Sequence, residues 1–78
     1  MTRQTAMAML TPQDLGVMGE HTVKHGIRLE TLDTQAGMRA YYRWKNAARR
    51  AEPPVRVTCG ETNNGTGRFF VRITGLED

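Results

Sequence analysis

The chain has 78 residues, a formal net charge of +3 and one cysteine, and 38% of its residues are hydrophobic. Its length predicts one small domain of marginal stability, because such a chain buries only about 60% of the surface exposed on unfolding. The single cysteine excludes an internal disulfide and is typical of a cytoplasmic protein. No apolar run reaches the roughly 18 residues that a membrane-spanning helix needs. The thin core also favours a homodimer or stabilisation by a larger partner.

The N-terminal quarter of the chain predicts an irregular segment followed by a helix. Residues 1–10 have weak patterning, so we expect them to be flexible or to add an edge strand to a single α+β domain over residues 11–78. A helix is predicted over residues 12–24, because Thr11 suits its N-cap and Gly26 suits the position just after its last turn.

A strand and a long helix come next. Residues 27–31 alternate apolar and polar side chains, which is typical of a half-buried strand. A helix is predicted over residues 34–51, capped by Asp33 or Thr34 and ended by the two prolines that begin at Pro53. At about 100° per residue its apolar side chains form one stripe. The stripe consists of Gly37, Ala40, Tyr41, Trp44, Ala48 and Ala51.

Two further strands are predicted over residues 55–59 and 68–74, joined by a hairpin through residues 60–67 that is rich in Gly and Asn. A three-residue loop with Gly65 in the left-handed conformation makes the apolar faces of the two strands agree. The predicted pairs are Val55 with Ile73, Val57 with Val71 and Cys59 with Phe69. A right-handed crossover then predicts a split β-α-β-β unit with the third strand between the first two, in the order 1-3-2, and the long helix on one face.

The long helix carries the strongest indication of a partner. Residues 34–51 include five basic residues and no acidic one. A helix face of one charge sign repels itself unless an anionic group neutralises it, although arginines also occur on merely solvated faces. Arginine forks suit phosphates and carboxylates, and a neighbouring tyrosine could stack on a base or anchor an interface. The candidate binding residues on this helix are Arg39, Tyr42, Arg43, Asn46, Arg49 and Arg50.

The face of the sheet turned away from the long helix is a second candidate. The predicted register places Arg56, Phe70 and Arg72 there and sets Arg56 opposite Arg72, a like-charge pair that Glu30 could offset. Phe70 among arginines is chemically similar to a stacking platform for single-stranded nucleic acid. A small sheet rarely leaves a phenylalanine bare, which favours cover by the first helix or a second subunit.

No catalytic or cofactor-binding pattern is present. His21 and His25 have the helical spacing of metal ligands, but two surface histidines near a helix end are the more common case. Cys59 falls on the apolar side of its strand, which is typical of a small buried side chain. The glycine-containing residues 60–67 lie between strands, whereas a phosphate-binding loop leads into a helix. We therefore expect no enzyme, no metal and no cofactor.

The size and the β-α-β-β layout from about Ile27 onward resemble the short accessory proteins that phages and mobile elements encode, some of which are anti-CRISPR proteins. The resemblance assigns no residue a role. It implies a small inhibitor or regulator that docks on a larger protein or ribonucleoprotein complex. Many anti-CRISPR proteins are acidic, whereas the long helix here is basic. This difference argues against a mechanism that mimics nucleic acid, and it leaves two other mechanisms, blocking of a protein surface and contact with the guide RNA.

Three functions are therefore compared. The first is an inhibitory or regulatory module whose arginines meet acidic groups or phosphates of a larger complex. The second is a protein that binds DNA or RNA directly with the same helix face, in a monomer or a dimer. The third is an assembly protein in which Phe70 and Met38 fill an interface between copies.

Overall fold

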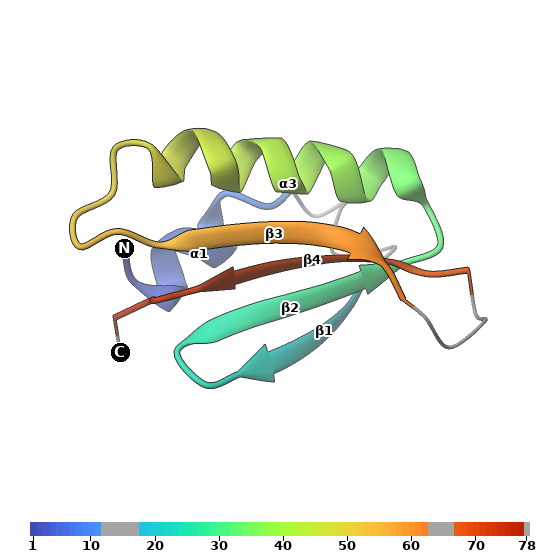
Figure 1. Ribbon diagram of the computed structural model, residues 1–78, viewed down its shortest axis with the longest axis horizontal. Helices are drawn as coiled ribbons and strands as arrows, with labels where there is room; N and C mark the ends of the chain where they lie inside the picture. The colour runs from blue at the N-terminus through green and yellow to red at the C-terminus, as the bar shows by residue number, and fades with distance from the viewer. Residues whose placement is uncertain (12–17, 63–66, 78) are drawn as a thin grey trace.

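A computed structural model describes residues 1–11, 18–62 and 67–77, and its helices lie on one side of a four-stranded sheet (Figure 1). The strands follow the order β1-β2-β4-β3, and each is antiparallel to its neighbours. The elements are α1 Arg3–Ala8, β1 Met18–Val23, β2 Gly26–Thr31, α3 Thr34–Ala48, β3 Arg56–Glu61 and β4 Phe69–Thr74. The Cα radius of gyration is 11.7 Å, close to the about 11.5 Å expected for a compact chain of this length.

The predicted α+β unit is confirmed. The strands expected over residues 27–31, 55–59 and 68–74 correspond to β2, β3 and β4, and β4 lies between the other two. Because β4 is antiparallel to both neighbours, β2 and β3 run parallel, as a crossover through α3 requires. Helix α3 contacts all three of these strands.

The helix predicted over residues 12–24 is wrong where the structure describes it. Met18–Val23 form β1, which pairs along its whole length with β2. A tight turn joins the two strands, with His25 at a φ of 55° in the left-handed region. Gly26 follows this turn rather than a helix, and a Cβ there would collide with the Ile73 carbonyl oxygen. Residues 12–17, the first half of the predicted helix, lie outside the described part of the chain.

Most of the first residues form the helix α1, and the extended Thr2 before it makes an isolated parallel bridge with Glu77. The Thr2 side chain caps α1 by accepting a hydrogen bond from the Thr5 backbone amide at 3.1 Å. Ala6 and Leu10 are buried in the main core, so this short helix gains the apolar burial that its weak sequence pattern did not reveal. The Trp44 indole ties it to α3 by donating a hydrogen bond to the Ala6 carbonyl oxygen at 2.9 Å.

The predicted β3–β4 register is wrong by two residues. The observed pairs are Val57 with Ile73, Cys59 with Val71 and Glu61 with Phe69. A two-residue shift keeps every side chain on its predicted face, so the apolar pattern could not distinguish the two registers. The Thr62 amide donates to the Arg68 carbonyl oxygen at 2.9 Å, which makes the connection longer than three residues. The predicted conformation of Gly65 lies outside the described residues.

The core lies between the sheet and the two helices. Asp33 starts α3 by accepting hydrogen bonds from the amides of residues 35 and 36, and the predicted stripe turns inward with Trp44 and Ala40 fully buried. Gly37 brings the helix onto the sheet so closely that a Cβ would lie 2.8 Å from Phe69 Cε1. The sheet supplies Ile27, Leu29, Val71 and Ile73. Within the described ranges, the helices are too short or too polar to cross a membrane.

Candidate functional site

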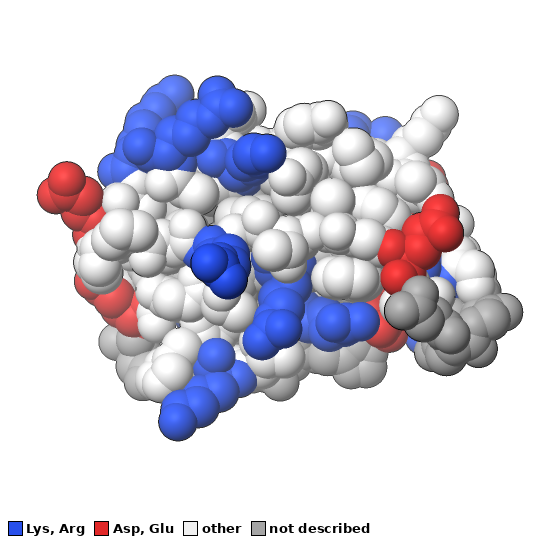
Figure 2. Space-filling model, in the orientation of Figure 1, with Lys and Arg blue, Asp and Glu red and all other residues white. Residues whose placement is uncertain are grey.

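The outward side of α3 carries the predicted basic residues. We call the side chains of Arg39, Tyr42, Arg43, Asn46, Arg49 and Arg50 the helix face. All of them are exposed except Arg43, which is half-buried. The inward stripe fixes the rotation of the helix, so positions four and seven residues apart fall together on the solvent side. Figure 2 shows blue side chains gathered over the C-terminal half of α3 at the upper left.

The helix face has a single charge sign. Within the described part of the chain, Arg39, Arg49 and Arg50 form no ion pair. Arg49 is the C-cap of α3 and Arg50 follows it, so both lie where the negative end of the helix dipole favours a cation. Arg39 lies in the second turn, too far from that end to be stabilised by it.

Tyr42 of the helix face is in contact with a second tyrosine, Tyr41. Tyr42 is 53% exposed, and its ring meets that of Tyr41 edge-on with centroids 5.3 Å apart. Lys45 Nζ donates a hydrogen bond to the Tyr41 hydroxyl at 3.0 Å and lies 5.2 Å from the ring centroid. This hydrogen bond raises the pKa of Lys45 above its usual value. Lys45 therefore lies along the helix against Tyr41, and Tyr42 is an exposed ring that contacts Tyr41.

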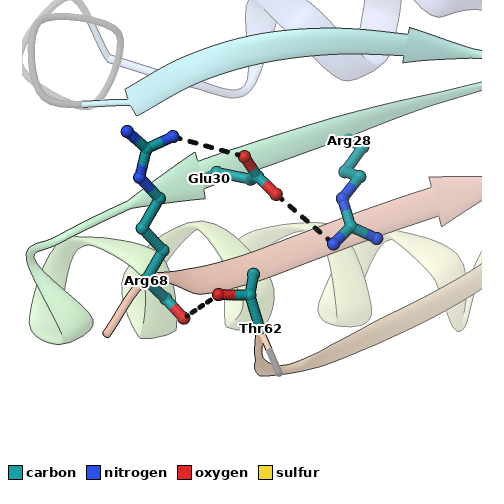
Figure 3. Close-up of polar contacts among 4 residues, drawn as sticks. All are labelled: Arg28, Glu30, Thr62 and Arg68. Atoms are coloured by element: carbon teal, nitrogen blue, oxygen red, sulfur yellow. Dashed lines mark hydrogen bonds and ion pairs between the residues drawn. The ribbon is translucent and has the colours of Figure 1, made fainter. Parts of the chain in front are cut away.

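The remaining predicted residues lie on the other side of the molecule. Arg56 and Arg72 are exposed and Phe70 is half-buried on the side of β2, β4 and β3 that faces away from α3. We call this side the open sheet face. The structure therefore divides the predicted set between two surfaces with the core between them. Figure 3 shows α3 behind the sheet, on the side opposite to the drawn side chains of the open sheet face.

Arg56 is not opposite Arg72, as the predicted register had it. Arg56 pairs with Thr74, while Arg72 lies opposite Thr58 on one side and Arg28 on the other. The expected like-charge pair therefore exists, but Arg28 is the second member. The alternation of residues 27–31 already placed Arg28 on the same face as Glu30, which is the signal that could have identified it.

Phe70 is the centre of the open sheet face. The Arg28 guanidinium carbon lies 4.3 Å from the Phe70 ring centroid, a cation–π contact. On β3 the ring leans over Gly60, where a Cβ would lie 3.1 Å from Phe70 Cε1. The first helix expected to cover Phe70 was that of residues 12–24, of which Met18–Val23 form β1. Helix α1 packs in the core, on the opposite side of the sheet from Phe70.

A single carboxylate organises two of the arginines on this face. Glu30 lies 3.4 Å from an Arg28 nitrogen and 3.6 Å from an Arg68 nitrogen, with its own side chain only 16% exposed (Figure 3). Partly exposed ion pairs like these stabilise the fold by about 0–1 kcal/mol. The main effect of the Arg28–Glu30 pair is therefore geometric, since the Arg28 guanidinium that contacts Glu30 also lies over the Phe70 ring.

The other candidates are not assembled into a chemical site. His21 lies on β1 and His25 in the turn after it, so the helical spacing expected of metal ligands does not apply to them. Cys59 is half-buried and packs against the core. Among the described residues no three His, Cys, Asp or Glu side chains are grouped to hold a metal ion.

Comparison with known proteins finds no matching family model, no matching curated protein and no matching solved structure.

Proposed function

We propose that this protein is a non-enzymatic inhibitory or regulatory module, of the kind that phages and mobile elements encode. It docks its helix face on a larger protein or nucleoprotein complex. The observation that supports this function is the basic run over residues 34–51, which contains five basic residues, four of them exposed, and no acidic one. Such a surface gains free energy when acidic side chains or phosphates neutralise it.

The position of the charges favours binding over a structural explanation. Arg39 is exposed in the second turn of α3 and forms no ion pair within the described ranges. The helix dipole favours a cation only near the C-terminus of α3. A partner that supplies an anion beside Arg39 uses the bidentate fork of arginine.

Direct binding of DNA or RNA by the same face is the second candidate. Four of the five basic residues over 34–51 are arginines, which form phosphate contacts, and Tyr42 lies beside them. A direct nucleic-acid binder loses affinity steeply as salt rises. On duplex DNA the logarithm of its association constant falls with the logarithm of the salt concentration with a slope of about −0.9 per phosphate contact. A protein–protein contact of standard composition depends less steeply on salt.

Co-purification from cells tests the proposal. The triple variant R39E/R43E/R50E should lose the partner while its circular dichroism spectrum stays unchanged, because all three side chains lie outside the core. The triple lysine variant R39K/R43K/R50K is the matched control and should keep the partner at reduced affinity. Nuclease treatment of the complex separates the two candidates. A partner that remains bound to the glutamate variant would show that the helix face is only a solvated surface.

A further inference from the structure

The open sheet face carries more positive charge than its own residues balance. Its described ionisable side chains are four arginines and Glu30, and that carboxylate already contacts two of the arginines. Arg72 and Arg56 form no ion pair within the described ranges. Arg72 lies directly opposite Arg28, a like-charge pair that weakens an antiparallel sheet unless an anion lies near.

The same face carries an aromatic–guanidinium pair at its centre, with the Arg28 guanidinium over the Phe70 ring. Phe70 belongs to β4, the strand between β2 and β3, so arginines flank it along its own strand and from β2. The ring is held between Gly60 on one neighbouring strand and the Arg28 guanidinium from the other. Because Glu30 fixes that guanidinium, the aromatic–guanidinium pair is oriented before any ligand arrives.

We propose that the open sheet face binds single-stranded nucleic acid. An unpaired base stacks on the Phe70–Arg28 pair, and the adjoining phosphates meet Arg72 and Arg56. This combination of a stacking surface with a basic track is what unpaired bases require, and it tolerates any base because each has a π face. Three strands spaced about 4.8 Å apart give a width of about 10 Å, which fits two or three nucleotides.

Two other polyanions fit this face less well. A nucleic-acid duplex hides the faces of its bases inside the stack, so it could use the arginines but not Phe70. An acidic protein segment supplies carboxylates but no flat ring for the aromatic–guanidinium pair. Stacking and phosphate contacts do not depend on the 2′-hydroxyl, so DNA and RNA strands of one sequence should bind within about threefold of each other.

The site is separate from the helix face. A substitution that removes the same charge from the helix face is therefore a matched control for one on the open sheet face. Fluorescence anisotropy with labelled single-stranded decamers measures the affinity of each variant. F70L keeps an apolar side chain but removes the π face, and should weaken binding by about tenfold. R56Q/R72Q should weaken binding and flatten the salt dependence by about 0.7 per lost phosphate contact. R39Q/R50Q removes the same charge from the helix face and should change affinity by less than about threefold.

The wild-type protein gives a second measurement that does not depend on the folding of a variant. On titration with an unlabelled decamer, the Arg28 Nε–H and Phe70 ring protons should show the largest NMR shifts, because a stacked base adds a ring current there. The inference is overturned if F70L binds like the parent, if R39Q/R50Q loses as much affinity as R56Q/R72Q, or if a duplex or polyglutamate competes better than the single strand. Each of these results leaves the co-purification test of the helix face unaffected.

Discussion

Replacing Gly37 with alanine tests how closely α3 packs on the sheet. In a helix interior this substitution normally stabilises by about 1 kcal/mol, because alanine is the better helix former. Here the new Cβ would lie 2.8 Å from Phe69 Cε1 and closer still to Cδ1. Phe69 is only 7% exposed, so its ring cannot move into solvent without loss of core packing. Overpacking of this kind costs about 1–3 kcal/mol, which exceeds the gain in helix propensity.

We therefore expect G37A to lower the free energy of unfolding by about 1 kcal/mol. With a urea m-value of about 1 kcal/mol/M for a small domain, the midpoint should fall by about 1 M. Circular dichroism and the fluorescence of the buried Trp44 should report the same transition. The control is the double-mutant cycle with F69L, in which the smaller side chain makes room and G37A becomes neutral or stabilising. A rise in the urea midpoint for G37A alone would show that the helix and the sheet are not in close contact at this residue.

Three further substitutions test other contacts. W44F removes the hydrogen bond to the Ala6 carbonyl oxygen and leaves a void, so urea unfolding should show that the free energy of unfolding falls by about 2–3 kcal/mol. An unchanged midpoint would show that α1 does not pack on the core through Trp44. D33A removes the N-cap of α3 and should cost about 1 kcal/mol in thermal melts, whereas D33N should be nearly neutral. Y41F removes the acceptor that favours charged Lys45, so an NMR titration should show its pKa lowered towards the usual value; a pKa that stays raised would assign the shift to another group.

The sequence was sufficient for elements whose local signals agree with their packing. The alternation of residues 27–31 and the stripe through Trp44 each have one period and one buried face, and both elements were predicted on the correct face. The helix ends at Ala48, three residues before the predicted end at Ala51. The segment before Gly26 was predicted wrongly because a glycine suits both the end of a helix and the residue after a hairpin turn. Only pairing with β2, a contact between two strands, decides between these structures.

The candidate surfaces were predictable to a different degree. The helix face follows directly from helical periodicity and lies where it was expected. The open sheet face depends on cross-strand partners. The register error of two residues between β3 and β4 placed Arg56 opposite Arg72, where Thr58 lies, and the pairing of Arg28 with Arg72 across β2 and β4 was not predicted. A two-residue shift keeps each side chain on the same face of the sheet but changes its cross-strand neighbour. The contact between Arg28 and Phe70 could therefore be found only in the three-dimensional structure.

The central position of β4 determines when the sheet can form during synthesis. The β1–β2 hairpin and α3 precede it in the chain and consist of local contacts, whereas β3 pairs with no other described strand than β4. A nascent chain that has emerged only as far as β3 therefore exposes two strands with unpaired backbone and half a core. Folding to the native sheet must wait until β4 has left the ribosome and inserted between β3, made just before it, and β2, made much earlier.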